Sequence, residues 1–314
     1  KPGPNMDGRP RGERFKDIAA DLKAMAGGAT RPEGAPSPAP TSSPAPAPEP
    51  PKVNVPLAKS DNERARGLVD LDRKFVVDPA AMPPAAGSYF RRRPFLSSEV
   101  CRKWRCGYLP RDVGGEDRSG GTMRGRVVYP YLAEDGELLT WFGRDPEYEE
   151  KHAKWEAGGK TEREPIKTAF VKGFHKGIEL FGQHVLRQEG VKDKLQGLGL
   201  VVVEGPNEVI RFDTLGLPVV GLCGNRISEE QAEKVARFAR EVGGGTVTLM
   251  LDLDEEGRKG LLQCMEHLAQ RVPVRVGWSS RMYGGKFKGR QPESLTAEEW
   301  TEIREYLIRG QVKV

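Results

Sequence analysis

The stretch 247-VTLMLDLDEEGRKGLLQ-263 ends an apolar run with two aspartates, Asp252 and Asp254, and then changes at once to a charged segment with helical spacing. A continuous apolar run indicates a β-strand that is covered on both faces. Because residues i and i+2 of a strand project to the same side, we expect the two carboxylates to point together. Two carboxylates that close repel each other, which raises the pKa of one of them unless a cation is bound. The stretch therefore predicts a strand-to-helix junction that carries an acidic site.

Similar apolar runs lie on either side of this stretch, and segments with helical spacing separate them. The expected strands fall within residues 198–205, 217–224, 246–253 and 273–278, and the expected helices span residues 207–216, 229–242 and 256–270. Ser228, followed three residues later by Gln231, indicates a capping box at the start of the second helix. Strands that alternate with helices predict an α/β fold with a mostly parallel sheet flanked by helices.

Acidic residues follow two of the expected strands. Glu204 closes the first strand, Glu208 lies one helical turn later, and Asp252 and Asp254 close the third. Ligands of such sheets gather beyond the carboxyl ends of the strands. Carboxylate oxygens that converge without histidine or cysteine select Mg²⁺ or Mn²⁺. We therefore expect a site for one of these ions at this edge of the sheet.

A second interpretation of the two aspartates needs no metal. Asp252 would cap the next helix, and the positive end of that helix would favour Asp254 and Glu255. A helix cap does not require an acid from another strand, so the presence of Glu204 favours the metal site.

Residues 76–197 have a mixed α+β pattern. Ser97 or Ser98 is a suitable N-cap for a helix within residues 97–110. An Asp-Gly pair divides residues 125–144 into two β-rich runs, which is a strong hairpin signal.

The apolar residues within 171–190 return to helical spacing. They predict another helix, whose inward face consists of Ile178, Leu180, Phe181 and Val185.

The first 75 residues differ in composition from the rest. Residues 1–33 form an expected tail with a short amphipathic helix at 13–28, and residues 34–75 are rich in proline and alanine. Such a composition buries too little apolar surface to offset chain entropy, so a disordered linker is expected.

The chain has 314 residues and a net charge of +5, which permits a nucleic-acid partner without requiring one. Its four cysteines are scattered and form no C-x-x-C pair. This pattern argues against a disulfide scaffold and favours a reducing cytoplasm. No apolar run approaches the roughly 18 residues of a membrane span, so no membrane partner is expected.

Three segments, 201-VVVEGPNEV-209, 221-GLCGN-225 and 249-LMLDLDEEGRKG-260, resemble the Toprim domain shared by bacterial DnaG-type primases, topoisomerases and some nucleases. The upstream sequence chooses among these families. It resembles the N-terminal polymerase subdomain of DnaG-type primases in the ordered segments 88-SYFRRRPFLSSEVCRKWRCGYLP-110, 124-RGRVVYP-130, 134-EDGELLTWFGR-144 and 174-FHKGIELFGQH-184. The resemblance covers about residues 85–300 and implies a polymerase subdomain at 76–197, followed by a Toprim domain with a C-terminal helix at 198–314.

The resemblance also implies an activity, which is DNA-dependent synthesis of RNA primers by a two-metal nucleotidyltransferase in replication. Its substrates would be a single-stranded DNA template and ribonucleoside triphosphates, and a replicative helicase is a candidate partner. Glu204, Asp252 and Asp254 would be catalytic. By position, the metal ligands would be Glu204, Glu208, Asp252, Asp254 and Glu293, and the residues that bind nucleotide or template would be Lys176, Arg126, Arg144 and Lys167.

The chain departs from the family at 290-RQPESLTAEEW-300, where Gln291 and Glu293 replace the aspartates of a D-P-D motif. Glutamine offers only a neutral oxygen. The second metal is therefore expected to bind more weakly, or the active site to have lost part of its function. Two alternatives stay open. One is a Toprim nuclease or topoisomerase-like enzyme that uses the same metal site, and the other, motivated by Gln291, is a non-catalytic nucleic-acid-binding module. Zinc is expected only if a segment upstream of Lys1 supplies a zinc ribbon.

Overall fold

The computed structural model describes residues 71–112 and 121–309. They all belong to one compact unit. The expected helix at 13–28 and the expected linker up to residue 70 lie outside the described residues. The last part of that linker segment contains the short 3₁₀ helix η2 (Leu71–Lys74), whose Leu71 is buried.

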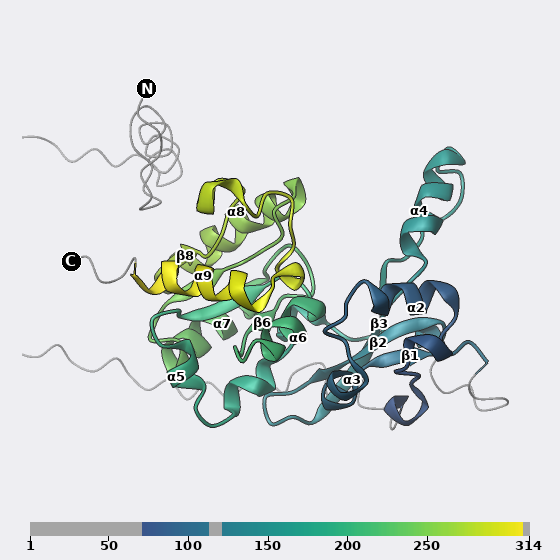
Figure 1. Cartoon of the computed structure of the whole chain (residues 1–314), viewed down its shortest axis with the longest axis horizontal. Helices are drawn as coiled ribbons and strands as arrows, with labels where there is room; N and C mark the ends of the chain where they lie inside the picture. The colour runs from purple at the N-terminus through teal and green to yellow at the C-terminus, as the bar shows by residue number, and fades with distance from the viewer. Residues whose placement is uncertain (1–70, 113–120, 310–314) are drawn as a thin grey trace, which may run out of the picture. The chain divides into compact units, whose positions relative to one another are not determined.

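An antiparallel sheet forms the first part of the described chain, with the strand order β1-β2-β3-β4. The strands are β1 (Gly107–Leu109), β2 (Arg126–Leu132), β3 (Leu138–Arg144) and β4 (Thr168–Phe170). The accompanying helices are η3 (Pro79–Ala81), α2 (Pro84–Arg91), α3 (Ser98–Lys103), η4 (Gly121–Met123) and α4 (Tyr148–Ala157), and α4 projects from the sheet between β3 and β4 (Figure 1).

Two local predictions in this part are confirmed. The Ser97 side chain caps α3 by accepting a hydrogen bond from the backbone N–H of Val100. The Asp-Gly pair lies in the turn between β2 and β3, which pair in antiparallel register with Tyr129 opposite Phe142. Gly136 adopts a φ of +86°, a left-handed conformation that favours glycine at this turn.

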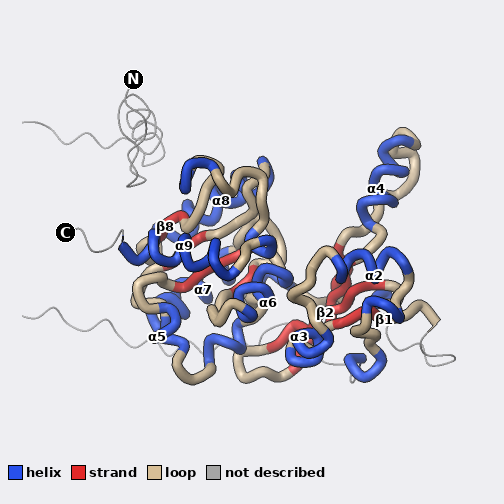
Figure 2. The backbone as a smooth tube through the Cα atoms, in the orientation of Figure 1, coloured by secondary structure: helices blue, strands red, loops and turns tan. Residues whose placement is uncertain are grey.

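A parallel sheet forms the second part, with the strand order β6-β5-β7-β8. Helices surround this sheet (Figure 2). Among them, α7 packs on β5 and β7, α6 on β6, and α8 on β8. The strands are β5 (Leu200–Val203), β6 (Val220–Gly221), β7 (Val247–Leu249) and β8 (Val274–Val276). The helices are α5 (Val191–Leu195), α6 (Pro206–Thr214), α7 (Glu229–Val242), α8 (Glu255–Ala269), η7 (Met282–Gly285), η8 (Pro292–Ser294) and α9 (Ala297–Arg309). The predicted α/β architecture is confirmed.

The apolar runs have the burial that a covered parallel sheet requires. All residues of β5 and β7 are buried, and each buried aliphatic side chain stabilises the fold by about 1.5–3 kcal/mol. The capping box of Ser228 and Gln231 is formed at the start of α7. One hydrophobic core contains side chains from both sheets, including Tyr129 of β2 and Val202 of β5. The two sheets are therefore parts of one packed body.

The helix predicted within residues 171–190 is wrong. This segment contains two short 3₁₀ helices, η5 (Lys176–Ile178) and η6 (Gln183–Arg187), instead of an α-helix. Gly182 has a φ of +80°, and a Cβ there would lie 2.7 Å from Val209 Cγ1. The chain therefore turns at this glycine against α6. Of the four residues predicted to face inward, Leu180, Phe181 and Val185 are buried, and Ile178 is half-buried.

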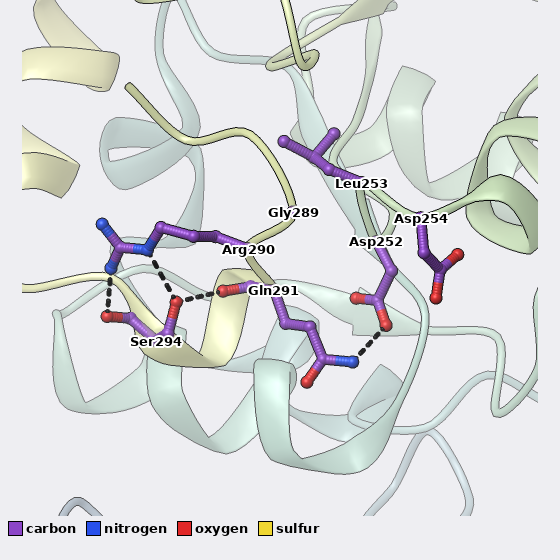
Figure 3. A pocket seen from close by; sticks show the side chains of 7 residues that line it. All are labelled: Asp252, Leu253, Asp254, Gly289, Arg290, Gln291 and Ser294. Carbon is purple, nitrogen blue, oxygen red and sulfur yellow. Dashed lines mark hydrogen bonds between the residues drawn. The ribbon is translucent and has the colours of Figure 1, made fainter. Parts of the chain in front are cut away.

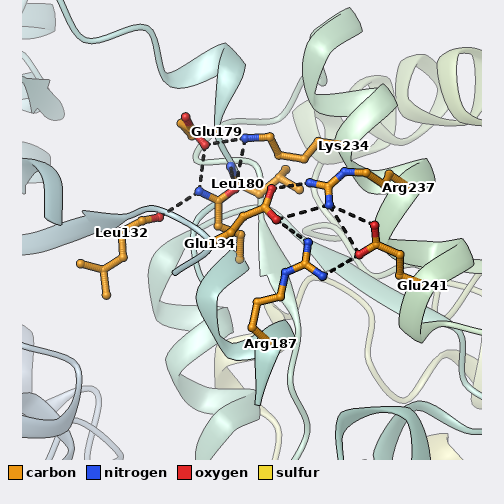
Figure 4. A network of polar contacts seen from close by, with 9 residues as sticks. Leu132, Glu134, Glu179, Leu180, Arg187, Lys234, Arg237 and Glu241 are labelled. Atoms are coloured by element: carbon orange, nitrogen blue, oxygen red, sulfur yellow. Dashed lines mark hydrogen bonds and ion pairs between the residues drawn. The ribbon is translucent and has the colours of Figure 1, made fainter. Parts of the chain in front are cut away.

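A network of charged side chains joins the β2–β3 hairpin to α7 (Figure 4). Glu134, in the hairpin turn, accepts hydrogen bonds from Arg187 and Arg237. Glu241 accepts from the same two arginines, at 2.7 Å from Arg187 Nη1 and 3.2 Å from Arg237 Nη1. Burial alone raises the pKa of Glu134, but the hydrogen bonds from the arginines outweigh it and hold the pKa below its usual value. These carboxylates are neutralised by the chain itself.

Across the described residues, no helix combines the length and the apolarity needed to cross a lipid bilayer. All four cysteines are free thiols.

Candidate active site

The acidic residues predicted from the sequence lie at one edge of the parallel sheet. Glu204 directly follows β5, and Glu208 lies in the first turn of α6. Asp252 follows β7, which is hydrogen-bonded to β5 with Val202 opposite Leu249. Because the two strands are parallel neighbours, their carboxyl ends bring these acids to the same edge.

The geometry of the aspartate pair differs from the prediction. β7 ends at Leu249, so Asp252 and Asp254 lie in the loop after the strand, and the alternation rule for strands does not orient them. Asp254 caps α8, with its Oδ1 accepting a hydrogen bond of 2.7 Å from the Gly257 N–H. Asp252 instead points toward Gln291 (Figure 3). The helix-cap interpretation is therefore wrong for Asp252, because Asp254 provides the cap in its place.

The electrostatics of the cluster show that its carboxylates act on one another. Burial raises the pKa of Glu204 to about 7, and the charges of Asp252 and Asp254 add to the rise. Burial also raises the pKa of Asp252 to about 6, although a hydrogen bond from Gln291 opposes the shift. Glu208 is only 7% exposed, and burial followed by the charges of Glu293, Asp252 and Glu204 raises its pKa well above the ordinary value. Within the described chain, no lysine or arginine forms an ion pair with Glu204, Glu208 or Asp252.

The donor atoms of this cluster suit a hard divalent cation. All are carboxylate oxygens, which Mg²⁺ and Mn²⁺ prefer. The Oδ1 atom of Asp252 is buried and has no hydrogen-bond partner, and a buried polar atom without a partner is costly unless something binds it. In residues 71–112 and 121–309, however, no three His, Cys, Asp or Glu side chains are already arranged to hold a metal ion. The chemistry of the residues fits such an ion, and the side chains would have to adjust to hold it.

Two of the basic residues predicted from the sequence lie beside the acids. The positive charges of Lys167 and Lys176 both lower the pKa of Glu204, and that of Lys167 also lowers the pKa of Asp252. Lys176 donates a hydrogen bond of 2.9 Å to the carbonyl of Cys223, in the loop after β6. Segments adjoining the antiparallel sheet thus supply cations to the acidic edge of the parallel sheet.

The two predicted arginines make their contacts elsewhere. Arg126 donates to the carbonyls of Thr122 and Ile166, at 3.1 and 3.2 Å. Arg144 forms an ion pair of 2.6 Å with Glu149 in α4. Their side chains support the segment that carries α4.

The residues that replace the family's D-P-D aspartates both have protein partners. Gln291 donates a hydrogen bond of 2.7 Å from Nε2 to Asp252 Oδ2 (Figure 3). Glu293 forms an ion pair with Arg93, with 2.9 Å between Glu293 Oε1 and Arg93 Nη2. A cavity of about 410 Å³ adjoins this element and is lined by Asp252, Leu253, Asp254, Gly289, Arg290, Gln291 and Ser294.

Sequence reasoning missed the residues that support Arg93. Its guanidinium lies 4.0 Å from the centre of the Tyr89 ring. The hydroxyl of Tyr89 accepts from Asn207 Nδ2 at 2.8 Å, and Tyr129 donates to Asn207 Oδ1 at 2.8 Å. Arg93 stands in a run of three arginines in the sequence, which gives no signal to separate it from its neighbours.

Comparison with known proteins yields structural likeness only. No protein-family model matches the sequence, and no curated protein matches it. The zinc-binding and RNA polymerase domains of the Aquifex aeolicus primase superpose with a TM-score of 0.54 at 20% identity, over 79% of this chain and 61% of that one. A DNA primase domain from Pseudomonas aeruginosa superposes with a TM-score of 0.51 at 21% identity, over 74% of this chain and 75% of that one. A DnaG primase catalytic domain bound to single-stranded DNA superposes with a TM-score of 0.51 at 18% identity, over 79% of each chain.

This chain thus spans about three fifths of the A. aeolicus structure and about four fifths of the DNA-bound DnaG domain. At such identities the likeness establishes the fold alone. With its parallel sheet flanked by helices and its antiparallel sheet, the chain has the fold of the DnaG-type primase catalytic core.

Proposed function

We propose that the protein synthesises RNA primers on a single-stranded DNA template, as a Mg²⁺- or Mn²⁺-dependent nucleotidyltransferase in replication. The observation that carries this proposal is the convergence of Glu204 and Asp252, which follow two neighbouring strands, on a site near the charges of Lys167 and Lys176. Polymerisation of nucleotides needs such a combination, because the reacting phosphates are anionic and the charge on the leaving pyrophosphate must be offset.

Each residue has a distinct role in this proposal. Glu204, Asp252 and Asp254 would hold the divalent ion, and Glu208 and Glu293 are the other carboxylates within reach of the cluster. When bound, the ion offsets the negative charge that develops during phosphoryl transfer. Lys167 and Lys176 bind the phosphates of the incoming ribonucleotide or of the template.

The remaining basic residues and the division of the chain also belong to the proposal. Arg126 and Arg144 contact template phosphate only if their present partners release them. The N-terminal polymerase subdomain would span residues 76–197, and the Toprim domain residues 198–314. A cytoplasmic location and a replicative helicase as partner follow from the same function.

One assay tests the function against its alternatives. Labelled ribonucleotides are added to the protein with single-stranded DNA and Mg²⁺ or Mn²⁺, and new oligoribonucleotides are expected. A shortened template would instead indicate a nuclease. DNA binding without either reaction would indicate a non-catalytic module, an alternative favoured by the hydrogen bond of Gln291 to Asp252.

The variant Asp252→Ala sharpens the assay. Because it removes a carboxylate without removing a hydrophobic contact, synthesis should fall by at least about 100-fold while the fold and DNA binding are retained. Asp193→Ala, at an exposed position of α5, is the matched control and should leave synthesis unchanged. Unchanged synthesis by Asp252→Ala would falsify the site assignment.

A further inference from the structure

We propose that this chain holds one divalent cation at its acidic edge rather than two, because Gln291 and Arg93 already occupy the side chains that would hold a second. The inference rests on the metal site of the proposed function. Gln291 and Arg93 would thus determine how many metal ions bind. Arg93 is not among the site residues predicted from the sequence.

The first half of the argument concerns Asp252. A carboxylate that bridges two cations offers one oxygen to each. In this chain Oδ2 of Asp252 accepts the Gln291 amide at 2.7 Å, and Oδ1 is buried and has no partner. Asp252 thus has one oxygen ready for a cation. An amide N–H only donates hydrogen bonds and is a poor neighbour for a metal ion.

The second half concerns Glu293. Both of its oxygens are engaged by Arg93, Oε1 at 2.9 Å from Nη2 and Oε2 at 3.2 Å from Nε. The two side chains are only 12% and 17% exposed, so their bidentate ion pair is largely shielded from solvent. The guanidinium already supplies, at this carboxylate, the positive charge that a second cation would bring.

Arg93 is also held from its other side. It stacks on Tyr89, whose hydroxyl belongs to the buried network with Tyr129 and Asn207. If Glu293 turned to a second cation, the largely shielded guanidinium of Arg93 would lose its carboxylate partner, which disfavours the exchange. The element that contains Gln291 and Glu293 thus has no free carboxylate for a second ion.

The experiment counts bound Mn²⁺ on the full chain, by the loss of the electron paramagnetic resonance signal of free Mn²⁺. Wild-type protein should bind one Mn²⁺ per chain at the site. Gln291→Asp places a carboxylate beside Asp252 and should bind two, with an affinity for the first ion on the order of tenfold higher because ligand charge increases. Gln291 is exposed, so the substitution is compatible with folding.

A matched control separates this effect from a general gain of negative charge. Gln188→Asp makes the same change at another exposed position and should behave as wild type. Asp252→Ala should remove the ion from the site, which identifies the binding that is counted. Thermal unfolding gives a second readout, since Mn²⁺ should raise the Tm of Gln291→Asp more than that of wild type.

The possible results separate this inference from the proposed function. Two ions on the wild type, or equal counts for wild type and Gln291→Asp, would overturn the inference, whether or not primers are made. One ion on the wild type and two on the variant, without primer synthesis, would support the inference and count against the function. Absence of Mn²⁺ binding by both proteins would overturn the inference together with the metal site on which it rests.

Discussion

Two groups of carboxylates in this molecule have opposite electrostatic environments. In the network at the β2–β3 hairpin, Glu134 and Glu241 are paired with two arginines, and the pKa of Glu134 lies below its usual value (Figure 4). At the edge of the parallel sheet, Glu204 and Asp252 have no ion-pair partner in the described chain, and their pKa values are raised to about 7 and about 6. The first group stabilises the fold, whereas the charge repulsion within the second weakens it, and the cation of the proposed function would offset that repulsion.

Under the proposed function, this difference separates the carboxylates that stabilise the fold from those that bind a ligand. A carboxylate that serves the fold is neutralised by a side chain that the sequence supplies. A carboxylate that binds a ligand has no such neutralising side chain beside it. Its charge therefore lowers the stability of the fold when the ligand is absent. The two groups should therefore respond in opposite ways when a carboxylate is replaced by a neutral amide.

The largest expected effect is the loss of activity in Glu204→Gln. We expect primer synthesis to fall by at least about 100-fold, because a neutral amide replaces a proposed metal ligand. In EDTA the Tm should stay equal or rise, since a repelled charge is removed. Measurement of both quantities on one preparation tests the prediction, and a clear drop in Tm would assign Glu204 to the fold instead.

The next effect is a dependence of stability on pH in EDTA. Glu204 and Asp252 have raised pKa values in the folded state, so the folded chain binds protons more tightly than the unfolded chain. Their contribution is fully present below about pH 4, the usual range of these acids, and is lost as the pH rises through 6 to 7. The free energy of unfolding should therefore fall by about 4 kcal/mol between pH 5 and pH 8.

This pH effect must be isolated from that of other groups. Burial lowers the pKa of His184 to about 4, so this histidine acts in the opposite direction and destabilises the fold as the pH falls below 6.5. Subtraction of the profile of Glu204→Gln from that of the wild type removes the His184 contribution. A flat difference profile would show that Glu204 has an ordinary pKa.

A smaller effect is expected for Glu134→Gln, in the paired network. Loss of this carboxylate leaves Arg187 and Arg237 to repel each other, and the half-exposed position limits the cost to about 1–2 kcal/mol of unfolding free energy. Primer synthesis should be retained. Glu305→Gln, which breaks the exposed ion pair with Arg309 on α9, is the control and should change stability by less than about 0.5 kcal/mol. Chemical denaturation distinguishes these values.

Much of the fold follows from local patterns in the sequence. Continuous apolar runs predicted the parallel sheet, and single residues such as Ser97 and Ser228 identified the starts of helices. Local patterns failed within residues 171–190, where the apolar spacing suits a helix. There the backbone turns at Gly182 because it packs against α6, and a sequence window contains no information about that contact.

The location of the acidic residues was predictable from the sequence, but their geometry was predictable only in part. Glu204 and Asp252 could be placed at one edge because parallel strands end together. The cap by Asp254 depends on where β7 ends. Two carboxylates of the acidic site are engaged by contacts that are distant in the sequence. Gln291 contacts Asp252 across 39 residues, and Arg93 contacts Glu293 across 200 residues. Such contacts follow from tertiary packing and leave no periodic signal.

The most direct test of the central claim is the Tm of the wild type and of Glu204→Gln at pH 8 as Mg²⁺ is added after EDTA treatment. If the unpaired carboxylates form a cation site, the wild-type Tm rises with the Mg²⁺ concentration and that of the variant rises little, because ligand binding stabilises only the folded state that holds the site. An equal rise in both proteins, or no rise in either, would contradict the account.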